Sequence, residues 1–104
     1  MLNETFQALS DPTRRAILGL LVDQERSVND LVDRFELTQS TVSRHLQVLE
    51  RANLITRRRD GQRRMCALAT DSLAEVDEWM ETYRRFWVER LDRLDKVVGD
   101  GSRQ

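Results

Sequence analysis

Two short segments with helical periodicity, joined by a turn of three residues, constrain this chain more than any other feature of its sequence. The first spans residues 28–35 and the second runs from about Gln39 to Ala52. Each follows a good N-cap residue, Ser27 in one case and Thr38 in the other. Such a pair, with a tight turn between its members, is typical of a helix-turn-helix. The apolar positions are Val28, Leu31, Val32 and Phe35 in the first segment and Val42, Leu46 and Leu49 in the second.

A β-hairpin is predicted directly after the second segment. Asp60-Gly61 separates two runs of β-compatible residues, 54–59 and 62–68. This dipeptide favours a type I′ turn, because glycine adopts the positive φ that the turn needs. The hairpin would be the wing of the helix-turn-helix.

Three more helices complete the prediction. Residues 2–9 carry apolar side chains at helical spacing, and Asp11 with Pro12 starts a helix that ends near Val22. The apolar stripe of that helix is expected at Ala16, Ile17, Leu20 and Leu21. A long helix starts near Asp71 or Ser72 and runs to about Val98. The predicted fold class is mainly α with a small β-hairpin, a winged helix-turn-helix in the order α-α-α-α-β-β-α.

A chain of 104 residues has room for one domain. We assign it to residues 1–98, with the helix-turn-helix at about 28–52, the wing at about 54–68 and a dimerisation helix at about 71–98. Residues 99–104 are expected to form a polar tail. No apolar run reaches the roughly 18–20 residues of a membrane helix, and the N-terminus does not look like a signal peptide. The single cysteine excludes an intrachain disulfide, so we expect a soluble cytoplasmic protein.

Positive charge is concentrated in one stretch of an otherwise acidic chain. The formal net charge is −1, yet residues 40–64 hold seven arginines against two acids. The remaining residues carry ten basic and sixteen acidic groups. A segregated basic stretch of this kind indicates a surface that binds a polyanion.

The outer face of the second helix of the motif is polar and free of acids until Glu50. Small hydroxyl groups allow close approach to bases and phosphates, while arginine and glutamine read guanine and adenine edges in the major groove. Free backbone N–H groups at the start of the helix favour phosphate oxygens. The wing arginines near the turn are expected to contact the DNA backbone or minor groove. The predicted DNA-binding residues are Gln39, Ser40, Thr41, Ser43, Arg44, His45, Gln47, Arg51, Arg59, Arg63 and Arg64.

His45 is the only histidine and lies at the edge of the buried stripe. Two roles stay open for it: a hydrogen bond within the domain, which its position favours, and a phosphate or base contact. Metal ligation is disfavoured because no neighbouring ligands accompany it.

The last predicted helix carries more apolar surface than one small domain needs to cover. Its stripe is Leu73, Val76, Met80, Tyr83, Trp87, Leu91, Leu94 and Val98, with Trp79 and Phe86 on a second flank. The excess predicts burial against a second subunit. A fully intramolecular helix and an aromatic ligand site are the less favoured alternatives. Two copies of the motif about 34 Å apart would match successive major grooves of a palindromic site.

Four blocks of the sequence resemble the ArsR/SmtB family of bacterial winged helix-turn-helix repressors. They are ALSDPTRRAIL (8–18), QSTVSRHLQVLERANLI (39–55), RRRDGQRR (57–64) and YRRFWVERLDRL (83–94). The resemblance covers about residues 4 to 96. It implies a homodimer joined by the first and last helices, which represses operons that often include its own gene. The expected dimer-interface residues are Leu2, Phe6, Trp79, Met80, Tyr83, Phe86, Trp87, Leu91 and Leu94.

The metal-sensing half of the family pattern is missing. Ser27 and Asn29 stand where the arsenic- and cadmium-sensing members carry a Cys-x-Cys, and the last helix has no histidine. The sequence therefore resembles a branch without metal-sensing ligands, and no metal or cofactor is expected. The resemblance also implies release from DNA by an inducer, which the sequence does not identify. Cys66 in the second wing strand is interpreted as packing rather than as a redox switch.

The sequence favours a sequence-specific DNA-binding regulator over two other classes of function. A winged-helix module that binds protein instead of DNA would carry hydrophobic side chains on the outer face of its second motif helix, where this chain has Ser40, Arg44 and Gln47. An enzyme is disfavoured because the sequence has no glycine-rich phosphate loop, no nucleophile elbow and no catalytic Cys/His pair.

Overall fold

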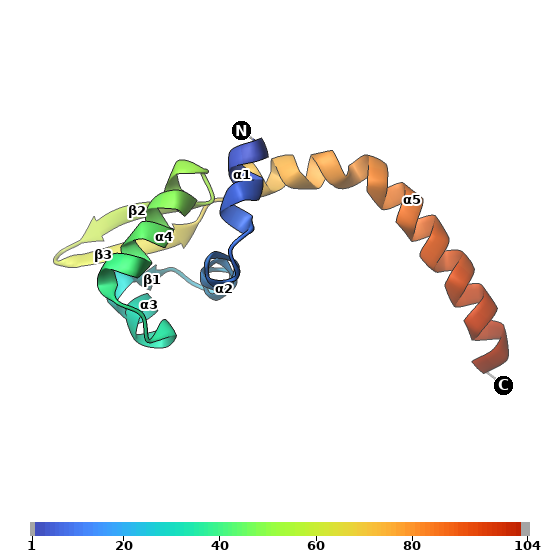
Figure 1. The fold of residues 1–104 in the computed structure, drawn as a ribbon, viewed down its shortest axis with the longest axis horizontal. Coiled ribbons are helices and arrows are strands. Elements are labelled where there is room, and N and C mark those ends of the chain that lie inside the picture. The colour runs from blue at the N-terminus through green and yellow to red at the C-terminus, as the bar shows by residue number, and fades with distance from the viewer. Residues whose placement is uncertain (1, 103–104) are drawn as a thin grey trace.

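The computed structural model describes residues 2–102, which form five helices and a small antiparallel sheet (Figure 1). The helix-turn-helix motif, the wing and the helices around them follow the predicted order, and one additional short strand precedes the motif. The elements are α1 (Leu2–Leu9), α2 (Pro12–Leu21), β1 (Arg26–Ser27), α3 (Val28–Phe35), α4 (Gln39–Arg51), β2 (Ile55–Asp60), β3 (Arg63–Leu68) and α5 (Asp71–Ser102).

The predicted N-cap residues start α2, α3 and α4. The carboxylate of Asp11 accepts hydrogen bonds from the backbone N–H groups of Thr13 (2.8 Å) and Arg14 (3.1 Å). These bonds, the one from Arg14 first, lower the pKa of Asp11 below its usual value. Ser27 and Thr38 cap α3 and α4 in the same way. Side-chain capping therefore fixes where each of these helices begins.

The core lies where α2, α3 and α4 meet the sheet. Val42, Leu46 and Leu49 of α4 are fully buried, as their spacing predicts. In α2 the buried residues are Ile17, Leu18 and Leu21, whereas Ala16 is exposed. The expectation for Ala16 was wrong because Leu18, on the other side of Ile17, faces the core instead. The rest of the buried apolar cluster is Ala8, Val28, Leu31, Ala52, Leu54, Ile55 and Cys66.

The sheet has three strands in the order β1-β3-β2. β1 pairs antiparallel with β3, with Arg26 opposite Cys66 and Ser27 opposite Met65. This strand was not predicted, because two residues are too few to show an alternating pattern. Its pairing joins the start of α3 to the wing, so the motif and the hairpin are held together by backbone hydrogen bonds.

The turn of the wing differs from the predicted type I′ turn. Asp60 pairs with Arg63, so Gly61 and Gln62 are the two central residues. Gly61 has φ +64°, and within the described part of the chain the only other positive φ angles belong to Glu36 and Asn53. Positive φ at the first central position alone is the pattern of a type II′ turn, which also favours glycine there. The prediction of a tight glycine hairpin was right, but its register was shifted by one residue.

Helix α5 leaves the body of the molecule and extends to Ser102 (Figure 1). The helix was expected to end near Val98 and to be followed by a polar tail. In the structure, residues 99–102 still belong to the helix. The side chain of Val98 lies outside the described residues. The molecule measures 59 × 32 × 21 Å, and its radius of gyration is 18.3 Å. A compact chain of this length would have a radius of about 13 Å, so much of α5 projects without support from its own domain.

Over residues 2–102, no helix combines the length and the apolar character that a membrane-spanning helix needs.

Candidate nucleic-acid interface

The outer face of α4 carries exposed polar and basic side chains. Ser40, Arg44, Gln47 and Arg51 are all exposed, opposite the buried stripe of the same helix. The guanidinium groups of Arg44 and Arg51 form no hydrogen bond or ion pair with any residue that the structure describes. These groups are therefore available to an external acceptor, as helical periodicity predicted.

The first turn of α4 is organised by Thr38. Its hydroxyl oxygen accepts a hydrogen bond from the backbone N–H of Thr41 (3.2 Å) and lies within hydrogen-bond distance of the hydroxyls of Thr41 (2.8 Å) and Ser40 (3.2 Å). Gln39 and Ser40 are exposed, whereas Thr41 and Ser43 are half-buried. The hydroxyl groups are thus held in place by the cap, at the end of the helix where backbone N–H groups point outward.

His45 is half-buried and makes a contact within the domain. Its Nδ1 atom lies 3.3 Å from Nη1 of Arg14 in α2. The contact agrees with the first of the two roles that the sequence left open, and the second nitrogen of the ring is not used in it. Arg14 was not singled out from the sequence. Nothing in local periodicity links residues that are 31 positions apart.

The wing arginines separate into two groups according to their partners. Arg58 pairs with the carboxylate of Glu25, and Arg57 lies 3.9 Å from a carboxylate oxygen of Glu50. The side chains of the other group form no ion pair within the described part of the molecule, and all of them are exposed near the turn. This second group consists of Arg59, Arg63 and Arg64, the three wing residues predicted to contact DNA.

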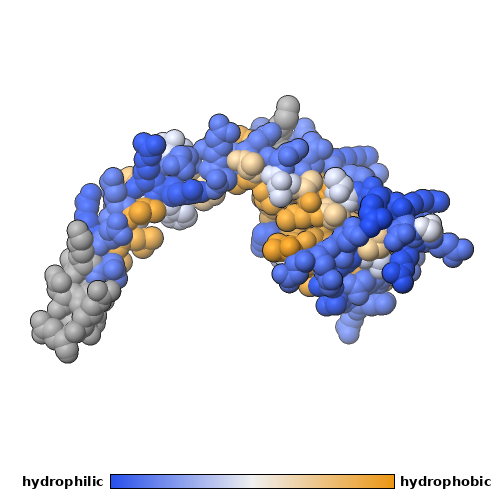
Figure 2. All heavy atoms as spheres, turned by 180° about the vertical axis from the view of Figure 1, so that it is seen from behind, coloured by the Kyte–Doolittle hydropathy of each residue, from blue (hydrophilic) through white to orange (hydrophobic). Residues whose placement is uncertain are grey.

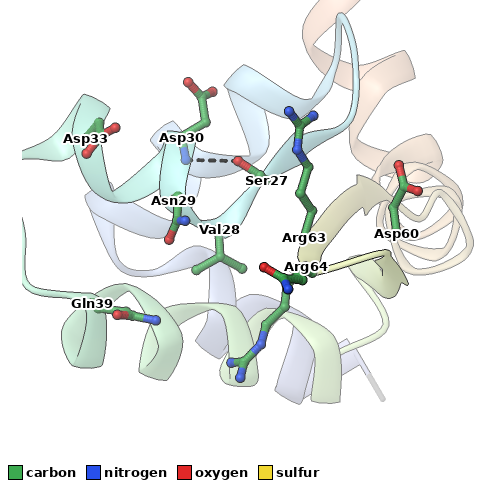
Figure 3. Close-up of a pocket in the computed structure, with 10 residues that line it drawn as sticks. Ser27, Val28, Asn29, Asp30, Asp33, Gln39, Asp60, Arg63 and Arg64 are labelled. Carbon is green, nitrogen blue, oxygen red and sulfur yellow. Dashed lines mark hydrogen bonds between the residues drawn. The ribbon is translucent and has the colours of Figure 1, made fainter.

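The pairing of the two wing strands decides which way these arginines point. Arg59 lies opposite Arg64, and Asp60 opposite Arg63. Paired residues share a face and successive residues alternate, so Arg59 and Arg64 lie on the face of the hairpin that carries buried Cys66. Arg63 lies on the other face. In Figure 3 the side chain of Arg64 extends toward α4, and that of Arg63 extends in the opposite direction.

A cleft of about 900 Å³ separates the tip of the wing from α3 and the start of α4 (Figure 3). Its lining is polar and contains both signs of charge. Asp30 hydrogen-bonds to Arg34 (3.0 Å) and Arg26 (3.2 Å), and these bonds, the one to Arg34 first, lower its pKa. Lining residues from the three elements include Asn29, Asp30, Asp33, Gln39, Arg63 and Arg64.

The positions that correspond to the metal-sensing thiolates have another use here. The Ser27 hydroxyl accepts a hydrogen bond from the backbone N–H of Asp30 (3.0 Å) and so caps α3. Within the residues that the structure describes, no three side chains of the metal-binding types are grouped closely enough to hold an ion. Cys66 is fully buried, and burial raises the pKa of its thiol. A buried neutral thiol fits its interpretation as packing.

A second surface consists of the exposed apolar side chains of α1 and α5. Phe6 and Trp79 join the two helices with ring centroids 5.3 Å apart in an edge-to-face arrangement, and Tyr83 follows 5.1 Å from Trp79. Figure 2 shows apolar atoms along α5 and on the body of the molecule beside it. Of the predicted interface residues, Leu2 and Met80 are half-buried. The exposed ones are Phe6, Trp79, Tyr83, Phe86, Trp87, Leu91 and Leu94, and Val88 adds to them.

The geometry defines a class of protein: a winged helix-turn-helix protein whose second motif helix has a basic outer face that is free of acids as far as Glu50. Comparison with known proteins gives the family. Residues 9–58 match the family described as a helix-turn-helix domain. The transcriptional repressor SdpR of Bacillus subtilis (strain 168) is 37% identical over 79 residues, which cover 76% of this chain and 88% of SdpR.

Two further relatives agree with this match. The HTH-type transcriptional regulator Rv2034 of Mycobacterium tuberculosis (strain ATCC 25618 / H37Rv) is 35% identical over 96 residues, covering 92% of this chain and 87% of the relative. The crystal structure of the ArsR family transcriptional regulator RHA00566 superimposes with a TM-score of 0.75 at 34% identity, over 83% of this chain and 89% of that one. The chain belongs to the ArsR family of winged helix-turn-helix transcriptional regulators, and it is a DNA-binding regulator.

Proposed function

We propose that the protein is a homodimeric repressor that binds a palindromic operator. One such operator lies upstream of its own gene. Helix α4 of each subunit enters a major groove, and the tip of each wing contacts the backbone or the minor groove beside it. Helix α5, together with α1, is the dimerisation surface. The name of the relative SdpR, a transcriptional repressor, supports repression as the direction of control.

The observation that carries this proposal is the exposed apolar face of α5. Trp79, Tyr83 and Trp87 are between 46% and 55% exposed, and Leu91 and Leu94 are about 60% exposed. A single large apolar patch is unfavourable in water and marks an interface. Phe6 of α1 is continuous with the patch through its contact with Trp79. A second copy of the same surface is a partner of matching chemistry, because a two-fold dimer places one patch against itself.

The contacts proposed for the arginine and glutamine side chains follow from their exposure and from the absence of partners within the described residues, and those of the hydroxyl groups follow from their place in the first turns of α4. Arg44, Gln47 and Arg51 would read base edges, and Gln39 with the hydroxyls of Ser40, Thr41 and Ser43 would hold phosphates. Arg59 and Arg64 share a face of the hairpin with each other, so they would contact the minor groove and the phosphates that border it. Arg63 on the opposite face would reach the backbone.

The decisive experiment combines the state of assembly with DNA binding. Sedimentation equilibrium of the whole chain should give twice the mass of 12.2 kDa. A duplex from the region upstream of its own gene should be retarded in a mobility-shift assay, and a footprint should show two protected half-sites one helical turn apart. Affinity should fall steeply as salt rises. A monomer, or the absence of retardation at low salt, would overturn the proposal. Capture of protein without nucleic acid would favour a protein-binding module.

A further inference from the structure

Arg14 connects three elements of the fold through one guanidinium group. Its Nε donates to the carbonyl oxygen of Ala8 (2.7 Å), and its Nη2 donates to that of Gln7 (3.1 Å). Both carbonyls belong to the last turn of α1, where they have no partner within the helix. The remaining nitrogen, Nη1, lies 3.3 Å from Nδ1 of His45 in α4. The backbone of Arg14 is fixed as well, because its N–H donates to the Asp11 carboxylate.

This contact determines which nitrogen of His45 carries the proton. An arginine side chain has five N–H donors and no acceptor. In the hydrogen bond with Arg14, Nδ1 of His45 must therefore be the acceptor. A neutral imidazole whose Nδ1 accepts carries its hydrogen on Nε2. Arg14 thus selects one tautomer and one orientation of the ring.

The Nε2 atom is open to a partner from outside the domain. Among the described side chains, the one buried nitrogen or oxygen without a hydrogen-bond partner is Nη1 of Arg57. Nε2 of His45 has no partner within that same part of the chain, so it reaches solvent. His45 follows Arg44 directly in α4, and it lies one turn after Thr41. The free donor therefore borders the face of α4 proposed to contact DNA.

We propose that Arg14 is a positioning residue for DNA binding: it holds His45 so that the Nε2–H group donates to a phosphate oxygen of the operator. The inference rests on the proposed function, because it requires α4 to lie against DNA. The contact from Arg14 through His45 to a phosphate is additional to the DNA contacts of the proposed function. The same guanidinium group holds the last turn of α1, so the orientation of the donor depends on the position of α1 relative to α4.

The first test measures operator affinity of the whole chain in a set of four variants. We expect His45→Ala and Arg14→Ala each to lower affinity by about tenfold, the scale of a hydrogen bond to a charged group. The double variant should lose no more than either single one, because both remove the same contact. Arg15→Ala is the matched control. It removes an equal charge from α2 and a bond to the α1 carbonyl of Leu9 (2.8 Å), yet it does not touch His45, and it should bind within about twofold of the wild type.

The second test observes the imidazole directly, and its first measurement needs only the wild-type protein. Nitrogen-15 spectra of the single histidine in the wild-type protein distinguish the two neutral tautomers. We expect hydrogen on Nε2 in the wild type, and a mixture of tautomers in Arg14→Lys, whose single ammonium group cannot hold both the α1 carbonyls and the ring. Melting curves of all variants show whether a loss of affinity comes from unfolding.

Each outcome decides the inference. Hydrogen on Nδ1 in the wild type would overturn it, as would additive losses in the double variant or wild-type affinity in folded Arg14→Ala or His45→Ala. A loss in Arg15→Ala equal to that in Arg14→Ala would also overturn it, because it would reflect charge or the α1 bond alone. Failure of the wild type to bind any operator would instead refute the proposed function, so the two failures are distinguishable.

Discussion

The arginines of this chain differ in what their guanidinium groups contact, and that difference separates candidate DNA contacts from structural residues. Arg26 is engaged by Leu20 and Asp30, and Arg58 by Glu25. Arg44 is exposed and forms no such contact with the part of the chain that the structure describes. A side chain that contributes nothing to the fold can be removed without harm to stability, so a loss of binding there reports on DNA directly.

Replacement of Arg44 by alanine is expected to weaken operator binding by about 1–3 kcal/mol if the residue reads a base. The loss should be concentrated at one base pair of the site, and substitution of that base pair should then cost the variant little. Fluorescence anisotropy with a labelled operator measures both. Arg15→Ala is again the control, since Arg15 is exposed on α2 and lies outside the proposed set of DNA contacts. Equal affinity of Arg44→Ala and wild type would remove Arg44 from the contact set.

Predictions from the sequence about single residues succeeded where the periodicity of one helix or strand determines whether a side chain is buried or exposed. Helical periodicity alone placed Val42 in the core and Arg44 in solvent. Periodicity could not reveal that Arg14 meets His45, because that contact depends on how α2 packs against α4. Periodicity also could not show which wing arginines are paired and which are free within the described part of the chain. The carboxylates that pair with Arg57 and Arg58 come from α4 and from the residues before β1.

At the scale of elements, the wing shows what local chemistry determines and what it leaves open. The Asp60-Gly61 pair predicted a tight turn, and glycine does occupy a position with positive φ. The register then follows from pairing along the whole strand, with buried Cys66 and Ile55 on the inner face. The last helix was expected to end near Val98, yet α5 continues to Ser102 and includes both Gly99 and Gly101. Propensity is a weak prior for residues that continue a long helix.

Two glycine substitutions should have opposite effects on stability. An added Cβ would meet no atom within 4 Å at either Gly61 or Gly19, so crowding plays no part. Gly61→Ala must hold alanine at φ +64° and should lower the free energy of unfolding by about 1 kcal/mol. Gly19→Ala in α2 should raise it by about 0.5–1 kcal/mol. Urea denaturation at one fixed protein concentration measures both, and stabilisation by Gly61→Ala would contradict the turn geometry.

The wing arginines should differ in their effect on the salt dependence of binding. Arg64→Ala is expected to weaken binding to all sequences alike, and to reduce the slope of log affinity against log salt by about 1. Arg58→Ala is the matched control from the same hairpin, because its guanidinium group already pairs with Glu25. It should leave the slope unchanged. A larger change of slope in Arg58→Ala than in Arg64→Ala would show that the ion pair opens on DNA.

For the whole molecule, the governing feature is that α5 extends away from the body of the fold (Figure 1). Residues 81–95 are all exposed in the single chain, including five large apolar or aromatic side chains beyond Tyr83. Sequence periodicity predicted this row of apolar side chains along α5, because the spacing of apolar residues within one helix is enough to reveal it. It could not give the direction in which α5 leaves the body. That direction is fixed by the packing of α1 against the first turns of α5 and by the bond from the Ser72 hydroxyl to the Ala52 carbonyl oxygen (2.7 Å).

Leu91→Glu should separate assembly from folding. A two-fold interface would receive the new carboxylate twice, and burial of an unpaired charge costs several kcal/mol. We expect the dimer dissociation constant to rise by about 100-fold or more, as measured by sedimentation equilibrium. The monomer should keep its helical circular dichroism, since Leu91 does not contact the core of its own chain. Val22→Glu is the control, because Val22 is 68% exposed and lies outside α5.

The same variant tests why two copies are needed on DNA. A single subunit keeps its own α4 and wing, so Leu91→Glu should still bind an isolated half-site as weakly as the wild type does. On the full operator it should lose the gain of about 10²–10⁴ that simultaneous engagement of both half-sites provides. If the variant is a monomer and yet binds the full operator with wild-type affinity, α5 does not set the spacing of the two reading units, and repression must depend on contacts within one subunit.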